Sequence, residues 1–160
     1  GNAPSHLRSP SMHAIQGFLS LVGRLMIVGI FLASAVMNKI PQFNAVADVM
    51  AAKGIQQPKI MLAGAIAFLI IGSVSIIIGY HARLGALLLL VFLAAATYYF
   101  HAFWKLAPDA PELQNEMAHF MKNAALMGTM VFIMANGAGP WSLDARSRSA
   151  AESESSTGAA

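Results

Sequence analysis

Four long runs of apolar residues constrain the fold of this chain more than any other feature. They cover residues 17–37, 60–80, 84–104 and 118–138. Each has about 21 residues, and at about 1.5 Å per residue a helix of that length rises roughly 31 Å, enough to cross the hydrocarbon layer of a bilayer. Only helices and closed barrels satisfy their backbone hydrogen bonds in lipid. The sequence therefore predicts an all-α fold, an integral membrane four-helix bundle in contact with the lipid bilayer.

The composition supports a membrane protein and excludes several kinds of chemistry. Of the residues, 57% are hydrophobic and 11% are charged, whereas a soluble domain has roughly 25% charged residues. The absence of cysteine excludes disulfide exchange, thiolate nucleophiles and thiolate metal sites. The formal net charge of +3 comes from basic side chains scattered between the apolar runs, so we expect no nucleic-acid partner.

The polar segments at the two ends divide the chain into three parts. Segment 1–16 is expected to be flexible, residues 17–144 form the membrane domain, and the tail 145–160 is expected to be disordered because it has no large apolar residue to bury. With four spans, both ends of the chain lie on one side of the membrane. We take that side as cytoplasmic, although the positive-inside rule does not decide, since four arginines on that side face four lysines on the other.

The loop between the first two apolar runs contains a further helical pattern. Phe43, Val46, Ala47 and Met50 recur at helical spacing, and Gly54 ends the pattern. A helix with one apolar face can lie flat in the membrane interface. We therefore expect a short interfacial helix in this loop, with an ordinary amphipathic loop helix as the alternative.

One arginine lies inside the first apolar run. No run contains an aspartate or glutamate that would neutralise Arg24, so its guanidinium must reach the headgroups, a backbone carbonyl or an anionic ligand. If the span begins a few residues later, Arg24 is an anchor at the interface instead. Asp144 follows the fourth run on the same side of the membrane, and we predict that it forms an ion pair with Arg83, with Arg24 as the alternative partner.

A larger set of polar side chains gathers at the opposite end of the predicted bundle. On each helix these side chains are three or four positions apart, so they share one face. The set consists of Asn38, Lys39, His101, Lys105, His119, Lys122 and Asn123, with Glu112 and Glu116 as carboxylates that can pair with His119 or Lys122. We predict that ligand binding involves His101, Lys122, Asn123, Lys39 and His119, with Arg24 as a further candidate.

This polar set lies beside the aromatic run 98–104 and suggests quinone chemistry. Imidazole exchanges protons near neutral pH, so His101 and His119 are candidate proton donors or acceptors. A quinone site needs an apolar slot, proton partners for the ring oxygens and positive charge for a developing anion. In the alternative interpretation the aromatic side chains form an interfacial belt and the lysines reach the headgroups. Two histidines without an intramembrane carboxylate are a poor ligand set, so we predict no metal site.

Several segments taken together resemble the DoxX family of small four-span membrane proteins. They are GRLMIVGIFLASAVMNKI, IIIGYHARLGALLLL, FHAFW and FMKNAALMGTMVFIMANGAGPWSLDAR, and the resemblance covers about residues 20–146. Arg24 and Lys39 match the basic residues that bracket the family's first helix, and Gly79 with Arg83 matches the turn after its second. The later motifs of the family match His101, Lys122, Asn123, Gly137, Gly139, Ser142, Leu143 and Asp144.

The resemblance implies a membrane subunit of an oxidoreductase complex in a bacterial inner membrane. Such a subunit would have a redox protein as partner and would itself contact a quinone. Its known members include a subunit of thiosulfate:quinone oxidoreductase, whereas many others have no assigned activity. This chain has no visible cofactor motif, and it has Ala67, Phe68 and Leu69 where many members carry a glutamate. A proton role tied to that carboxylate is therefore not carried over. The alternative function is a non-enzymatic scaffold or a module that binds a small solute.

Overall fold

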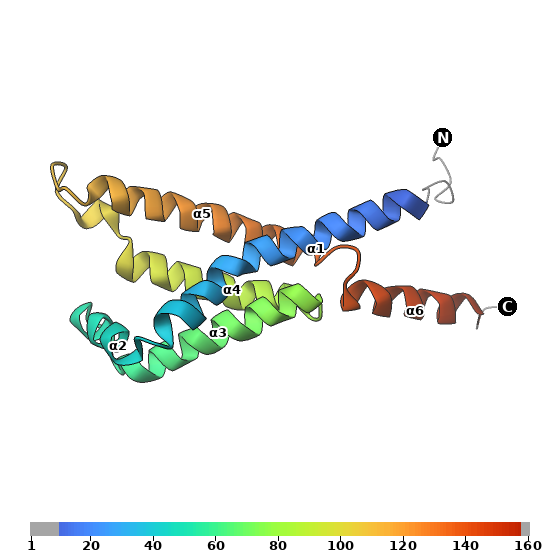
Figure 1. Cartoon of the computed structure of the whole chain (residues 1–160), viewed down its shortest axis with the longest axis horizontal. Helices are drawn as coiled ribbons and strands as arrows, with labels where there is room; N and C mark the ends of the chain where they lie inside the picture. Colours follow the sequence, from blue (N-terminus) through green and yellow to red (C-terminus); the bar gives the residue numbers. More distant parts are fainter. Residues whose placement is uncertain (1–9, 158–160) are drawn as a thin grey trace.

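The computed structural model describes residues 10–157, and over that part of the chain every regular element is a helix (Figure 1). The long helices are α1 (Pro10–Ala33), α3 (Pro58–Ile78), α4 (Ala82–Phe100) and α5 (Leu113–Asn136). Shorter elements connect or extend them: the π-helix η2 (Ser34–Lys39), α2 (Phe43–Ala52), the 3₁₀ turn η3 (Phe103–Lys105) and α6 (Leu143–Thr157). The predicted all-α membrane bundle is confirmed.

Within the described residues, three helices are long and apolar enough to cross a membrane. They cover Met12–Lys39, Pro58–Ile78 and Ala82–Lys105. The fourth long helix, α5, has 24 residues, and at about 1.5 Å per residue this gives a length of roughly 36 Å. Its first half carries Glu116, His119 and Lys122, so α5 is less apolar than the other three, and a crossing by α5 stays a prediction.

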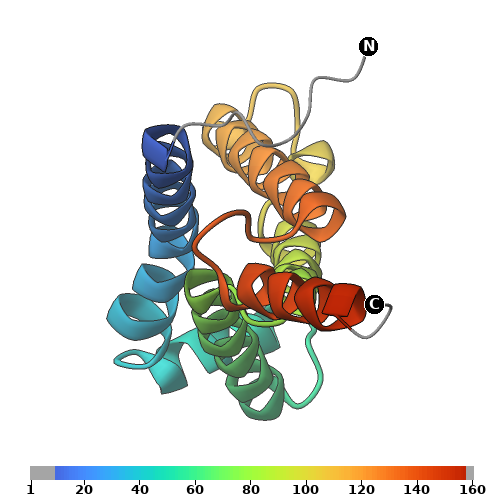
Figure 2. The same ribbon diagram turned by 90° about the vertical axis from the view of Figure 1, so that its right-hand side faces the viewer.

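The long helices pack in the order α1, α3, α4 and α5, so that α1 contacts chiefly α3 and α5 contacts chiefly α4 (Figure 2). The backbones of α3 and α4 approach each other closely. A β-carbon on Gly72 would lie 2.8 Å from the carbonyl oxygen of Gly85, and one on Gly85 would lie 2.8 Å from that of Gly72. Small residues at such crossings let two backbones approach closely in a membrane. The core around this contact includes Val28, Phe31, Leu69, Ile76, Leu89 and Met130.

The short helix predicted in the first loop is confirmed as α2. Its apolar face buries Ala47 and Met50 against Leu62 of α3. Gly54, with a φ of +79°, lies in the turn that follows, because the left-handed region carries no steric penalty for glycine. Pro58 then occupies the first turn of α3, where a missing backbone N–H removes no helical hydrogen bond.

The described range begins and ends with helix, in segments where flexible chain is expected from the sequence. Residues 10–16 belong to α1, and residues 145–157 belong to α6. Alanine, arginine and glutamate have high helix propensity, and the hydroxyl of Ser142 accepts a hydrogen bond of 3.2 Å from the backbone N–H of Ala145 at the start of α6. Figure 1 shows α6 extending away from the bundle. Residues 1–9 and 158–160 lie outside the described part of the chain.

Candidate functional site

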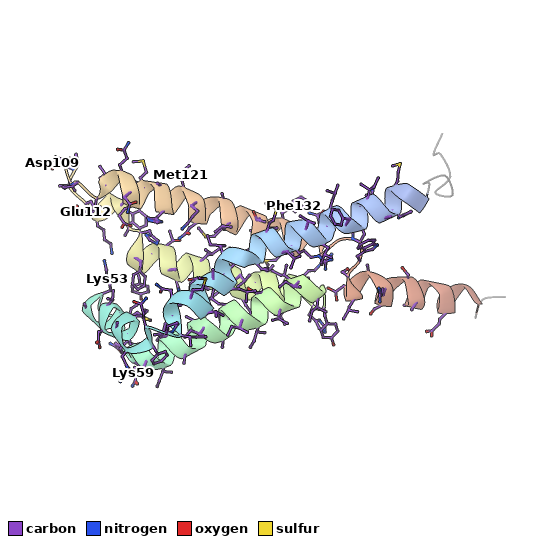
Figure 3. All side chains as sticks on the ribbon, viewed as in Figure 1. Lys53, Lys59, Asp109, Glu112, Met121 and Phe132 are labelled. Carbon is purple, nitrogen blue, oxygen red and sulfur yellow. The ribbon has the colours of Figure 1, made fainter. Side chains whose placement is uncertain are left out.

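A cavity of about 510 Å³ lies at the end of the bundle near α2. Residues of α1, η2, α2, α3, α4 and α5 line it, so the site depends on segments from most of the chain. Figure 1 shows that this end of the bundle is opposite the end at which α1 begins and α6 extends away. Figure 3 labels Lys53, Lys59, Asp109 and Glu112 at the same end as the cavity. Four predicted ligand-binding residues line this one cavity: Lys39, His101, Lys122 and Asn123.

The π-helix η2 brings Lys39 into the cavity wall. The backbone N–H of Ile40 donates to the carbonyl oxygen of Ala35 at 2.9 Å, the five-residue spacing of a π-turn. The Nζ atom of Lys39 lies 2.6 Å from Oγ of Ser34 and 5.3 Å from the ring centroid of Phe92. Single π-turns often occur at functional sites. Ser34 and Phe92 also line the cavity, and sequence reasoning missed both because α-helical spacing does not bring them to Lys39.

His101 follows the last residue of α4 and pairs with a carboxylate from α5. Its Nδ1 atom lies 2.8 Å from Oε2 of Glu116, and the two side chains are 24% and 26% exposed. Because an ionised carboxylate only accepts hydrogen bonds, Nδ1 carries the proton in this contact and Nε2 is left for another partner. The imidazole also stacks on the ring of His119, with centroids 4.8 Å apart. The sequence placed Glu116 near His119 or Lys122 and missed its contact with His101.

The remaining polar groups come from α5 and α4. Asn123 is only 6% exposed, and its Nδ2 atom donates to Oγ1 of Thr97 at 3.0 Å. Nζ of Lys122 lies 3.4 Å from Nδ1 of His119. His119 does not line the cavity but supports two residues that do. Thr97 was missed, although it lies four positions before His101 and so shares its helical face.

The aromatic run divides between the cavity and the outer surface. Tyr99 and Phe100 line the cavity together with His101. Tyr98 and Trp104 do not, and they are 54% and 50% exposed. Lys105 extends over the ring of Tyr98, with Nζ 5.0 Å from its centroid. One part of the run therefore belongs to the cavity wall, while the other has the exposure expected of an interfacial belt.

Arg24 lies at the opposite end of the bundle and points into it. Its side chain is 3% exposed. The guanidinium donates to the carbonyl oxygens of Ile77 at 3.0 Å and Trp141 at 2.8 Å, and Nε donates to that of Ser20 at 3.3 Å. Of the partners expected for the guanidinium of Arg24, the structure shows backbone carbonyls. Arg24 lies away from the cavity that other candidate residues line.

Asp144 caps α4 through backbone contacts. Its two carboxylate oxygens accept hydrogen bonds from the backbone N–H groups of His81 at 2.9 Å and Ala82 at 3.1 Å. Arg83 donates to the carbonyl oxygen of Ala135 at 3.2 Å, and its ion pair with Asp144 stays a prediction. Across residues 10–157, no group of three or more histidine, aspartate or glutamate side chains is positioned to hold a metal ion.

Comparison with known proteins identifies one family. The model of the DoxX family matches residues 19–102, slightly more than half of the chain. No curated protein and no solved structure matches the chain. The matched segment contains most of α1 and all of η2, α2, α3 and α4, and ends just after His101. The family match and the helical bundle agree, and the chain belongs to the DoxX family.

Proposed function

We propose that this DoxX-family protein is a membrane subunit of an oxidoreductase complex and that its cavity binds a quinone. The observation that carries the proposal is the meeting of Lys39, His101, Lys122 and Asn123 around one cavity with mostly apolar walls. Binding sites for small organic molecules combine such walls with a few convergent polar groups. The observed volume of about 510 Å³ falls within the range of roughly 300–1,000 Å³ found for these sites.

The cavity offers a separate partner for each part of a quinone. Phe31, Phe92, Leu93 and Leu126 supply an apolar slot for the ring. The amide of Asn123 and the ammonium groups donate hydrogen bonds to ring oxygens, which stabilises negative charge that develops on them. In this proposal the electrons come from a redox protein that partners this subunit.

His101 and Glu116 provide a route for protons. A quinone that accepts two electrons from the partner takes up two protons to become a quinol. In the imidazolium form of His101, Nδ1 is held by Glu116 at 2.8 Å and Nε2 carries a second proton, which it delivers to a ring oxygen before the neutral imidazole is protonated again. Both side chains are about a quarter exposed, so they can regain protons from water at this end of the bundle.

Titration of the purified protein with 1,4-naphthoquinone in a neutral detergent tests the proposal. Emission is followed from Trp104, three residues beyond His101, in a background in which Trp141→Phe removes the other tryptophan. We expect saturable quenching and a dissociation constant that rises about tenfold in His101→Ala and in Lys122→Ala, since each loses a polar contact.

The control variant is Lys105→Ala, because Lys105 belongs to the same aromatic run but lies over Tyr98 outside the cavity. It should bind quinone as the parent protein does. Quenching that never saturates, and that is the same in all variants, would refute the quinone site. A redox protein that copurifies in that case would support the scaffold function instead.

A further inference from the structure

We propose that the cavity selects lipophilic organic anions over neutral molecules of the same shape. The inference rests on the proposed function because it concerns the same cavity. It specifies in addition that the ligand is negatively charged. It does not require that the ligand be redox-active. Its basis is the balance of charge around the cavity, together with the apolar character of the walls.

The cavity is lined by cationic groups without carboxylates. Lys39 and Lys122 both contribute to its wall, and among the residues that the structure describes no aspartate or glutamate does. Within residues 10–157, Glu116 forms an ion pair with His101. Neither ammonium group forms an ion pair in this part of the chain. The two lysine charges of the cavity wall therefore have no carboxylate partner among the described residues.

The contacts of the two ammonium groups orient them without neutralising them. Lys39 bonds to the hydroxyl of Ser34 at 2.6 Å and lies 5.3 Å from the centroid of Phe92. Lys122 contacts an imidazole nitrogen of His119 at 3.4 Å. A hydroxyl, an aromatic ring and a neutral imidazole carry no net negative charge. A charge beside apolar walls is unfavourable unless it is paired, and an anionic ligand would supply the missing partner.

The walls determine what kind of anion fits. Most of the lining is aliphatic or aromatic, and the side chains of Asn38, Gln42 and Asn123 add amide donors for oxygen atoms. A small hydrated anion would leave those apolar walls uncovered. A molecule with an apolar body and an ionised oxygen-bearing head would cover the walls and pair with Lys39 at once. The ligand class is thus an ionised hydroxyquinone or an aromatic or fatty carboxylate.

Calorimetric titration of the full chain in a neutral detergent tests this selectivity with three ligands of similar size. 1,4-Naphthoquinone is neutral, 2-hydroxy-1,4-naphthoquinone is an anion at neutral pH, and 2-naphthoate is an anion without quinone chemistry. We expect both anions to bind about tenfold or more tightly than the neutral quinone, because a hydrogen bond to a charged group is stronger than one between neutral groups.

Variants of the two lysines connect the selectivity to the cavity. Lys39→Gln should weaken binding of both anions about tenfold and change that of 1,4-naphthoquinone by less than about twofold. Lys53→Gln is the matched control, because Lys53 belongs to the same loop region but does not line the cavity. If Lys39→Gln does not fold by circular dichroism, Lys122→Gln and Lys39→Arg take its place, and the arginine variant should keep the preference for anions.

The outcomes separate the inference from the quinone proposal. Equal affinity for the anions and the neutral quinone, or equal weakening of all three in Lys39→Gln, would overturn the inference while binding of 1,4-naphthoquinone still supports a quinone site. Binding of 2-naphthoate that depends on Lys39, with no binding of either quinone, would support the inference and overturn the quinone proposal. Decanoate that displaces 2-naphthoate supports a fatty anion as the ligand, and failure to displace it supports an aromatic one.

Discussion

Replacement of Arg24 by methionine should destabilise the bundle at the end opposite the cavity. Arg24 is 3% exposed and its guanidinium joins three segments, because it donates to Ile77 at the end of α3, to Trp141 in the segment after α5, and to Ser20 in its own helix. Methionine keeps much of the length of the side chain but donates no hydrogen bond. The carbonyl oxygens of Ile77 and Trp141 would each lose this partner.

The magnitude follows from the two bonds that connect different segments. Hydrogen bonds to charged groups contribute about 1.5–3 kcal/mol each in soluble proteins, whereas bonds between membrane helices average about 0.6 kcal/mol. Two such bonds give an expected loss of about 2–4 kcal/mol in the free energy of unfolding. Removal of a buried charge offsets part of this loss, which is why the upper figure stays below the simple sum.

Unfolding in mixed micelles of rising SDS fraction, followed by circular dichroism, measures this loss. The control is Arg83→Met, since Arg83 is exposed and has a single carbonyl contact of 3.2 Å with Ala135. That variant should stay within about 0.5 kcal/mol of the parent protein. If Arg24→Met were no less stable than Arg83→Met, the three carbonyl contacts would not hold the bundle together and the reasoning would be refuted.

Two further substitutions, Gly79→Ala and Asp144→Ala, test the same end of the bundle by the same unfolding assay, and Gly64→Ala in the first half of α3 is a control. Gly79→Ala should lower the free energy of unfolding by about 2 kcal/mol or more, because Gly79 has a φ of +69° and a β-carbon there would collide with Ser142. Gly64→Ala places its new methyl group where nothing lies within 4 Å. It should therefore be neutral or stabilising by up to about 1 kcal/mol. Asp144→Ala should cost about 1–2 kcal/mol because α4 loses a cap on two backbone N–H groups, and an unchanged unfolding curve would show that this cap contributes nothing.

The sequence by itself determined the class of fold and one end of the bundle. Apolar runs long enough to cross a bilayer predict membrane-spanning helices. Apolar residues at helical spacing predicted α2. Successive spans run in opposite directions. The residues that end the first and third spans therefore lie on the same side of the membrane as the residues that begin the fourth. That argument alone brought Lys39, His101, Lys122 and Asn123 to one end, where the structure places them around one cavity.

Only the tertiary structure decided how each helix is rotated and which distant groups meet. Hydropathy gives the depth of Arg24 in the bilayer but not the direction of its side chain, and its partners in α3 and after α5 lie 53 and 117 residues away in the chain. The contact of His101 with Glu116 likewise depends on how the connection between α4 and α5 folds back. Local sequence patterns encode periodicity within a helix, whereas the π-turn at η2 and these contacts depend on packing between helices, which no local pattern specifies.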